Sequence, residues 1–212
     1  MTTQKNKNLS RDQIRRLTIT GMLTAIIILL AFTNLGLIPI GTISITTIHL
    51  PVLIGLLAEG PLVGFILAFV FGACSLLRAL ISPSGPFDVF FLNPLISILP
   101  RLLIPLTAWG MFRLIKALLP NKKPMDSVAW AAAGLAGSLT NTVFVLLSIY
   151  LWYGGRVAEW IGQNPDLAQY ANAAGKFLFF AVALPNGIPE ALVTLILIPA
   201  IMAAVMAVKK RR

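Results

Sequence analysis

Charged residues are scarce in this sequence, and cysteine and histidine are almost absent. Asp, Glu, Lys and Arg make up only 11% of the 212 residues, whereas 58% are hydrophobic. A soluble globular protein needs more polar surface than this, so the composition predicts an all-α integral membrane protein. The single cysteine, Cys74, excludes an internal disulfide and lies in an apolar run without metal-ligand spacing. We therefore expect no metal site and no cofactor.

Recognisable catalytic patterns are missing as well. With one histidine, His49, the chain has no pair of zinc-binding histidines, and none of the long apolar runs contains two carboxylates. No glycine-rich phosphate loop ends in Lys-Ser or Lys-Thr, which excludes ATP hydrolysis by that route. An intramembrane enzyme, such as a protease or a lipid-modifying hydrolase, is therefore disfavoured, and no catalytic residue is assigned.

The chain does contain a series of hydrophobic runs. A membrane-spanning helix needs about 20 predominantly apolar residues. The first run follows a basic segment, residues 1–16, and no small-residue cleavage site comes after it, which indicates a retained anchor rather than a signal peptide. We predict a single membrane domain over residues 1–212 with six transmembrane helices, at 17–34, 48–58, 62–81, 93–119, 127–153 and 186–208.

Basic residues outnumber acidic ones by 17 to 7, and most of them lie at the ends of the predicted spans. This distribution argues against nucleic acid as a partner, because no soluble basic face is formed. With six spans, the basic clusters before the first, after the fourth and after the last share one side, which the positive-inside rule makes cytoplasmic. Both termini are thus expected in the cytoplasm. The extracellular loops are long, and residues 154–185 are expected to form a partly helical lid.

Polar residues within the fourth span point to a binding site. Asn93, Ser97 and Arg101 recur at i, i+4 and i+8 and therefore share one helical face. Pro100 lacks an amide hydrogen and is expected to free a backbone carbonyl and bend the helix next to Arg101. Because polar groups are costly in hydrocarbon, this face is expected to line the bundle interior or a cavity.

Other spans carry polar residues in their outer halves at helical spacing. Amides, an aromatic ring and guanidinium groups together suit a pocket for a small polar molecule. The alternatives are a buried Arg101–Glu190 ion pair, an Asn141 hydrogen bond between helices, and an Arg78 side chain that reaches the outer surface. The further pocket candidates are His49, Arg78, Asn141, Trp152, Asn186 and Glu190. Ser75 and Ser82 share a helical face with Arg78, Ser148 shares one with Asn141 and Trp152, and Thr194 shares one with Asn186 and Glu190.

Small residues recur at four-residue spacing in several spans, which permits close helix packing in lipid. In the first span Gly21 and Ala25 form such a pair, and the polar residues of this span are confined to its cytoplasmic end. The face that carries Gly21 and Ala25 is therefore a candidate contact with another subunit.

Three segments resemble the substrate-binding S components of energy-coupling factor (ECF) vitamin transporters. They are HLPVLIGLLAEGPLVGFILAFVFG at 49–72, LNPLISILPRLLI at 92–104 and NGIPEAL at 186–192. Together with the six-span plan, the resemblance covers nearly the whole chain. The NP…LPR and N-x-I-P-E patterns are similar to the branch that includes pantothenate carriers. The resemblance implies a vitamin pocket in the outer halves of the later helices, capped by the first outer loop.

The resemblance also implies partners and a location. In that family the first helix docks through an A-x-x-x-A motif on a transmembrane coupling subunit bound to two ABC ATPases, and the S component topples in the membrane during transport. Here the motif reads Gly21-x-x-x-Ala25, with glycine in place of the first alanine. The implied setting is a bacterial plasma membrane, with ATP used only by the partner subunits.

For pantothenate, an anion with hydroxyl groups and an amide, we expect Arg101 to bind the carboxylate. Trp152 would form an apolar wall, and Glu190 would orient Arg101 or an asparagine. The alternative is a neutral or cationic vitamin, pyridoxine-like or hydroxymethylpyrimidine-like, with Glu190 neutralising Arg101. A secondary carrier that works without ATPases is the other alternative class. The amides expected to bind the ligand's hydroxyl and amide groups are Asn93, Asn141 and Asn186.

Overall fold

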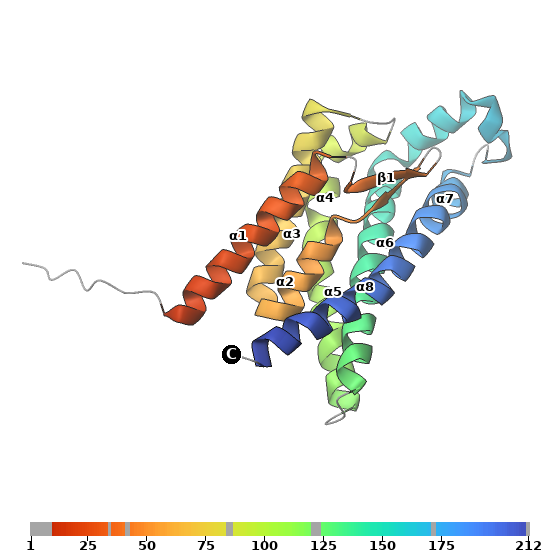
Figure 1. The fold of residues 1–212 in the computed structure, drawn as a ribbon. Helices are drawn as coiled ribbons and strands as arrows, with labels where there is room; N and C mark the ends of the chain where they lie inside the picture. The colour runs from red at the N-terminus through yellow and green to blue at the C-terminus, as the bar shows by residue number, and fades with distance from the viewer. Residues whose placement is uncertain are drawn as a thin grey trace, which may run out of the picture.

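The chain folds into a bundle of long helices (Figure 1). The computed structural model describes residues 10–33, 35–40, 43–83, 87–119, 124–170 and 173–210. The principal helices are α1 (Arg11–Ala31), α2 (His49–Glu59), α3 (Pro61–Ile81), α5 (Leu99–Leu118), α6 (Pro124–Gly162) and α8 (Leu184–Lys210). The shorter elements are β1 (Leu37–Ile40), β2 (Ile43–Thr46), η1 (Asp88–Leu92), α4 (Pro94–Ser97), η2 (Pro165–Tyr170), α7 (Ala174–Lys176) and η3 (Phe177–Ala183).

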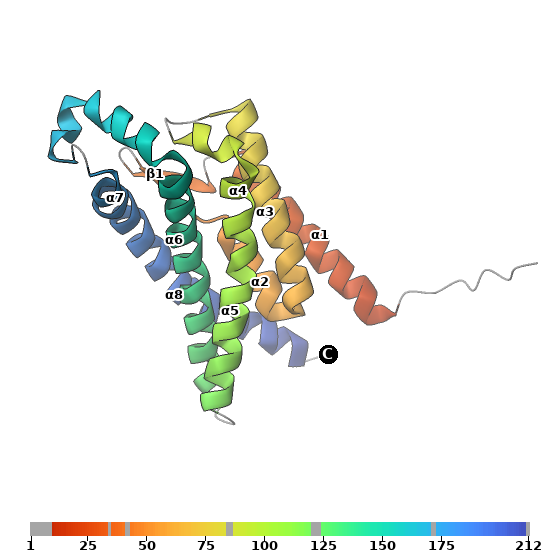
Figure 2. The ribbon, with the colours of Figure 1, turned by 180° about the vertical axis from the view of Figure 1, so that it is seen from behind.

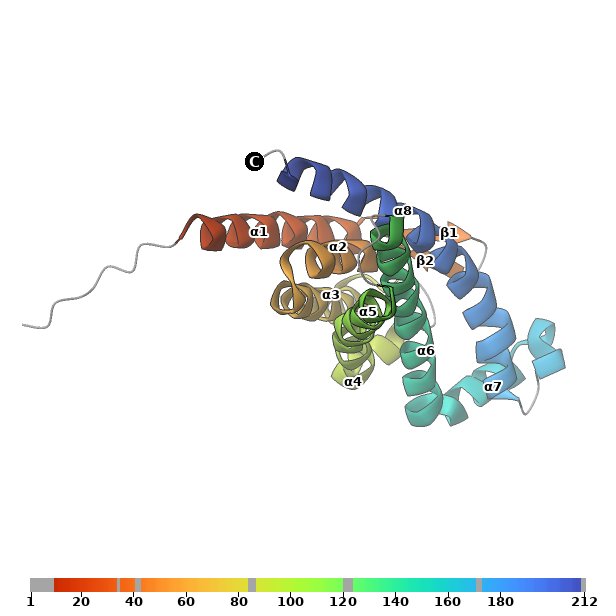
Figure 3. The same ribbon diagram turned by 90° about the horizontal axis from the view of Figure 1, so that it is seen from below.

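Five helical segments of the described chain are long and apolar enough to cross a membrane, and α2 is shorter. At about 1.5 Å per residue, α2 extends roughly 16 Å, about half the hydrocarbon core of a bilayer. Almost every residue of α2 is buried, because α1, α3, α5, α6 and α8 surround it (Figure 3). The predicted second span is therefore a short buried helix that returns the chain through the middle of the bundle.

The first helix begins at Arg11, so the predicted start at residue 17 was wrong. Ser10 and Gln13 form a capping box, in which the Gln13 amide donates to the Ser10 hydroxyl at 3.3 Å and the Ser10 amide donates to the Gln13 side chain at 2.8 Å. The helix starts at this cap rather than at the edge of the apolar run. Arg15 and Arg16 consequently belong to α1.

One end of the bundle gathers the start of α1, the turn between α2 and α3, and the end of α8. The turn is made at Gly60, whose φ of 102° is a left-handed conformation that favours glycine. Next to it, Glu59 pairs with Arg15 at 3.2 Å and with Lys209 at 3.0 Å. We call this the inner end of the bundle, and the opposite end the outer end.

The predicted helix 93–119 is interrupted near its outer end, at the proline where the sequence predicted a bend. α4 ends before Ile98, and α5 begins immediately after it. Pro100 accounts for the break because it has no amide hydrogen to donate to the Ile96 carbonyl. α3 packs closely against this break, where a Cβ atom on Gly72 would lie 2.8 Å from the Ile98 Cα.

The predicted outer loop 154–185 is mostly helical where the structure describes it. α6 continues to Gly162 through a kink at Tyr153, whose φ and ψ are −133° and 16°. After η2, the short helix α7 and the π-helix η3 lead without a break into α8. These extensions lie together at the outer end (Figure 2). The sequence predicted a partly helical segment here, and the helical part is longer than expected because apolar residues 177–183 continue the helix and bury part of their surface.

An antiparallel hairpin of β1 and β2 connects α1 to α2, in a register that pairs Leu37 with Thr46. The described chain is nearly all helical, as the predicted all-α class requires, and this hairpin is a short exception that the sequence did not predict. Isoleucine and threonine recur there, and β-branched residues favour extended backbone. The hairpin lies across the outer part of the bundle, beside α8 (Figure 1).

Buried apolar side chains form two clusters stacked along the helices. The inner cluster joins α1, α2, α3, α5, α6 and α8. The outer cluster joins η1, α4, the outer part of α6 and η3. Members of the inner cluster include Leu53, Phe71, Ile104, Ala133 and Ile198. Members of the outer cluster include Phe90, Ile96, Val145, Ile149, Val157 and Phe177.

Candidate functional site

Most of the buried polar residues lie between the two apolar clusters, whereas His49 lies beside Ile48 and Leu50 of the inner cluster. On α5, Arg101 falls between Ile96 of the outer cluster and Ile104 of the inner cluster. On α6, Asn141 likewise falls between Val145 of the outer cluster and Ala133 of the inner cluster. Each of these polar residues is at most 6% exposed. We call the following six residues the polar layer: His49, Arg101, Ser138, Asn141, Glu190 and Thr194.

Contacts between helices place the polar layer at one depth. Gly137 of α6 lies against Ile104 of α5, where an added Cβ would be 3.2 Å from the isoleucine side chain. Because α5 and α6 are antiparallel neighbours, one turn outward from this contact leads to Arg101 on one helix and Asn141 on the other (Figure 1). Glu190 of α8 reaches the same depth, since its carboxylate is hydrogen-bonded to the residue of α6 that follows Asn141.

The guanidinium of Arg101 is held by a carbonyl and two aromatic rings. Its Nη1 donates to the Ile96 carbonyl at 2.7 Å, which is the carbonyl that Pro100 leaves free. Its Cζ lies 5.0 Å from the centroid of Phe91 and 5.2 Å from that of Phe71. Its Nε has no hydrogen-bond partner among the described residues. The side chain is thus fixed in place with donor capacity left for an anion.

Asn141 is the second buried group with an unused hydrogen-bonding atom. Its Oδ1, like the Oγ of Ser138 one turn away, finds no partner within the described part of the chain. A buried polar atom without a partner costs about 1–3 kcal/mol, so such atoms are rare unless they serve a ligand or water. Arg101 and Asn141 therefore offer a donor and an acceptor at the same depth.

Glu190 is fully engaged by two neighbours. One oxygen accepts from the Thr46 backbone amide at 2.6 Å, and the other accepts from the Thr142 hydroxyl at 3.3 Å. Arg101 attracts Glu190 electrostatically but hydrogen-bonds to a backbone carbonyl instead. Glu190 therefore ties the hairpin to α6 and α8, whereas the sequence predicted that it would orient Arg101 or an asparagine.

His49, at the first position of α2, is connected to the same helix. Thr194 donates its hydroxyl hydrogen to the Glu190 carbonyl at 2.7 Å, and its Oγ1 lies 2.8 Å from His49 Nε2. Because the threonine has only one hydrogen to give, we infer that the histidine nitrogen is the donor of the second bond. The ring thereby fastens α2 to α8. Within the described ranges, no group of three or more His, Cys, Asp or Glu could hold a metal ion.

Asn93 and Ser97 lie outward of Arg101, beside the helix break. Asn93 caps α4 by accepting from the Leu95 amide at 3.0 Å, and its Nδ2 donates to the Tyr153 hydroxyl at 3.4 Å. The Ser97 hydroxyl donates to the Asn93 carbonyl at 3.2 Å. Both side chains thus have partners within the protein, and they support the short helix that precedes Arg101.

The remaining predicted pocket residues are placed differently. Asn186 is half-buried on α8, one turn outward from Glu190. Trp152 is 61% exposed and does not face the polar layer, because the buried face of α6 shifts to neighbouring positions before the kink at Tyr153. Arg78 donates to the Ala31 carbonyl at 3.3 Å and so links α3 to the end of α1.

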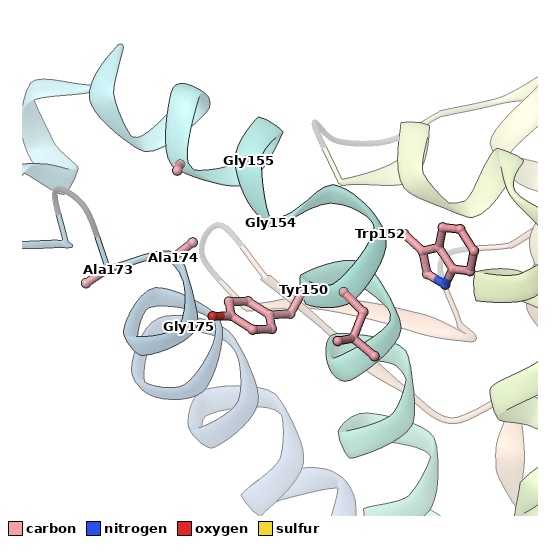
Figure 4. A pocket seen from close by; sticks show the side chains of 9 residues that line it. Tyr150, Trp152, Gly154, Gly155, Ala173, Ala174 and Gly175 are labelled. Carbon is pink, nitrogen blue, oxygen red and sulfur yellow. The ribbon is translucent and has the colours of Figure 1, made fainter.

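Two cavities occur at the outer end. An open groove of about 660 Å³ lies between α6 and α7. Tyr150, Trp152 and Gly175 are among the residues that line it, and Tyr150 points toward Gly175 (Figure 4). A smaller cavity of about 70 Å³ lies within the outer cluster, lined by Phe87, Phe90, Val157 and Trp160. Neither is lined by the polar layer, which lies deeper under the outer cluster and the hairpin.

Several residues of the site were missed from the sequence. Ser138 lies three residues before Asn141 and four residues before Thr142, and this helical spacing could have been found in the fifth span. The two rings against Arg101, Phe71 and Phe91, carry no such signal because phenylalanine is common in apolar spans. The hydrogen bond from Thr46 is donated by its backbone amide, which any residue type except proline could supply.

The outward face of α1 has the predicted small residues. Gly21 and Ala25 are exposed, and a Cβ on Gly21 would meet nothing within 4 Å. The opposite face packs on the bundle through Ile27, which is fully buried. Leu17 and Leu29 continue the exposed face at the same four-residue spacing and are 67% and 54% exposed. We call these four exposed residues, Leu17, Gly21, Ala25 and Leu29, the α1 stripe.

Comparison with known proteins gives a match to a family model and a match to a single curated protein. The family model for the substrate-specific component of ECF transporters matches residues 15–202. A curated relative, the pantothenic acid transporter PanT of Lactococcus lactis subsp. cremoris (strain MG1363), is 29% identical over 168 residues. That alignment covers 75% of this chain and 76% of the relative.

Proposed function

Because this chain belongs to the family of ECF transporter substrate-specific components, we propose that it captures pantothenate for an ECF-type importer. The proposal depends above all on the polar layer, where Arg101 and Asn141 keep buried hydrogen-bonding atoms without protein partners. The similarity to a pantothenic acid transporter supports this choice of vitamin. Members of the family are transport components rather than enzymes, so no catalytic role is assigned.

The chemistry of the ligand fits the free atoms of the polar layer. Arg101 binds the carboxylate, because a guanidinium in a water-poor site forms charge-assisted hydrogen bonds that are stronger than neutral ones. Asn141 accepts a hydrogen bond from a ligand hydroxyl or amide through Oδ1. Phe71 and Phe91 hold the guanidinium plane and keep water away from it. Asn186 meets the outer part of the ligand.

Glu190 acts on the cap of the pocket rather than on the ligand. Its two hydrogen bonds fasten the end of β2 to α6 and α8, directly above the depth of Arg101. The Glu190 oxygens bind the hairpin and α6 rather than the ligand, and the positive charge of Arg101 offsets their repulsion of an anionic vitamin. In this proposal the hairpin is the first outer loop that caps the ligand, and Asn93 and Ser97 shape the neighbouring wall.

Delivery of the vitamin depends on partner subunits. The α1 stripe docks on the transmembrane coupling subunit, and two ABC ATPases bound to that subunit use the ATP. The bundle topples in the membrane to release the ligand. Basic residues gather at the inner end, so the positive-inside rule places that end and both termini in the cytoplasm of a bacterial cell, with the outer loops outside.

Calorimetric titration of the purified chain in detergent tests the ligand. We expect one-to-one binding of pantothenate and no heat from pyridoxine. Arg101→Met fills most of the volume of the side chain but removes the charge, so it should weaken pantothenate binding by about 100-fold or more, equivalent to about 3 kcal/mol. Arg113→Ala is the matched control, because Arg113 is an exposed arginine on the same helix near the inner end.

The possible results separate the alternatives. Unchanged pantothenate affinity in a folded Arg101→Met variant would overturn the assignment of the carboxylate site. Heat from a neutral vitamin with none from pantothenate would keep the family and replace the ligand. Uptake by liposomes that contain this chain alone would contradict the requirement for ATPase partners.

A further inference from the structure

Four charged residues from three helices meet at the inner end, outside the polar layer. The carboxylate of Glu59, at the end of α2, lies 3.2 Å from Arg15 and 3.9 Å from Arg16 of α1. Its other oxygen lies 3.0 Å from the ammonium of Lys209 of α8, which also donates to the Ala58 carbonyl. One carboxylate therefore joins the first helix and the last helix to α2.

The burial of Glu59 distinguishes this cluster from ordinary surface ion pairs. Its side chain is 1% exposed, whereas those of Arg15, Arg16 and Lys209 are 41%, 60% and 28% exposed. A buried carboxylate is unfavourable unless it is paired, and here three cations compensate it. Without Glu59, three like charges would face one another. The negative charge of Glu59 therefore allows the three cationic side chains to lie close together.

α1 has few other contacts near this end. Its fully buried residues, Ile27 and Ala31, lie toward the outer end. Residues 11–22 contain no buried side chain, and Leu23 is the first that packs on the inner cluster. Besides the half-buried Ile19 and Thr20, the ion pairs with Glu59 hold the inner half of α1 on the bundle.

We propose that Glu59 is a positioning residue for docking: it fixes the angle of α1, so that the α1 stripe meets the helices of the coupling subunit in one orientation. This inference rests on the proposed function, because it takes the coupling subunit as the partner of that stripe. Glu59 has no part in ligand binding, since the inner cluster separates it from the polar layer. The same carboxylate holds the end of α8, which makes α1 and α8 move as one body at the inner end.

Two measurements on Glu59→Gln test this role. Amide hydrogen exchange of residues 11–22 in the chain alone should rise about tenfold, because breaking the pairs with a buried charge releases the inner half of α1. Pantothenate binding in detergent should stay within about twofold of the wild type, whereas uptake by the complete transporter should fall about tenfold. Asp126→Asn is the control, because Asp126 pairs with Lys116 at the same end without joining α1.

Two further variants keep the test decisive. Glu59→Asp retains the charge, and the long cationic side chains can follow it, so uptake and exchange should return most of the way to wild-type values. Arg15→Gln removes one cationic partner of Glu59. It replaces Glu59→Gln in both measurements if that variant does not fold. Unchanged exchange in α1, or a loss of binding parallel to the loss of uptake, would overturn the positioning role. Failure of the wild-type chain to bind pantothenate would contradict the proposed ligand. The hydrogen-exchange measurement would still test whether Glu59 holds the inner half of α1 on the bundle.

Discussion

The hydrogen bonds of Glu190 make a quantitative prediction for ligand release. Replacing Glu190 with leucine removes the acceptor for the Thr46 amide at 2.6 Å and for the Thr142 hydroxyl at 3.3 Å. A hydrogen bond to a charged group contributes about 1.5–3 kcal/mol, and the longer second bond contributes less. If this energy holds the hairpin closed over the ligand, its loss should speed pantothenate release about 10- to 100-fold.

A release-rate measurement distinguishes this role from direct ligand contact. Labelled pantothenate is bound to the purified chain and chased with excess unlabelled ligand. Glu190→Gln keeps a neutral acceptor for the Thr46 amide and should accelerate release less than Glu190→Leu. Thr142→Val removes only the longer bond and should have the smallest effect. Complete loss of binding in both Glu190 variants, or an unchanged release rate in Glu190→Leu, would refute the reasoning.

The structure makes two further predictions. Gly72→Val should lower the melting temperature in detergent, because its Cβ would lie 2.8 Å from the Ile98 Cα and 2.9 Å from the Ser97 carbonyl, and overpacking against backbone costs about 1–3 kcal/mol. Gly110→Val has open space around it and is the control; equal melting temperatures would contradict the tight packing at the helix break. Gly21→Leu should leave pantothenate affinity unchanged and reduce uptake by the complete transporter, because the added side chain projects from the exposed face of α1. Normal uptake by that variant would contradict docking through this face.

Much of the architecture was predictable because hydropathy and helical periodicity are local properties of the sequence. Five helical segments of the described chain are long and apolar enough to cross a membrane, and the small residues Gly21 and Ala25 are exposed on the first helix. Pro100 was identified as a source of a free carbonyl, and Arg101 uses the Ile96 carbonyl in the structure. The depth of Arg101 and Asn141 follows from the same local spacing along two helices.

The errors concern boundaries that local hydropathy does not determine. α1 starts earlier because a capping box at Ser10 provides its first hydrogen bonds. The outer segment 154–185 is mainly helical because its aromatic residues pack into the outer cluster, as Trp160 and Phe177 do with ring centroids 5.8 Å apart. Trp152 stays a predicted ligand contact; its side chain is 61% exposed and lines the groove beside α7.

The sequence by itself determined the membrane class, the long apolar segments, the gathering of basic residues, and the burial of Arg101, Asn141 and Glu190. Only the tertiary structure decided the partners of those residues. Glu190 is bound to a backbone amide of the hairpin rather than to Arg101, and Glu59 joins three helices that are distant in the chain. Burial can be read from composition and spacing along one segment, whereas a partner depends on which faces of different segments meet.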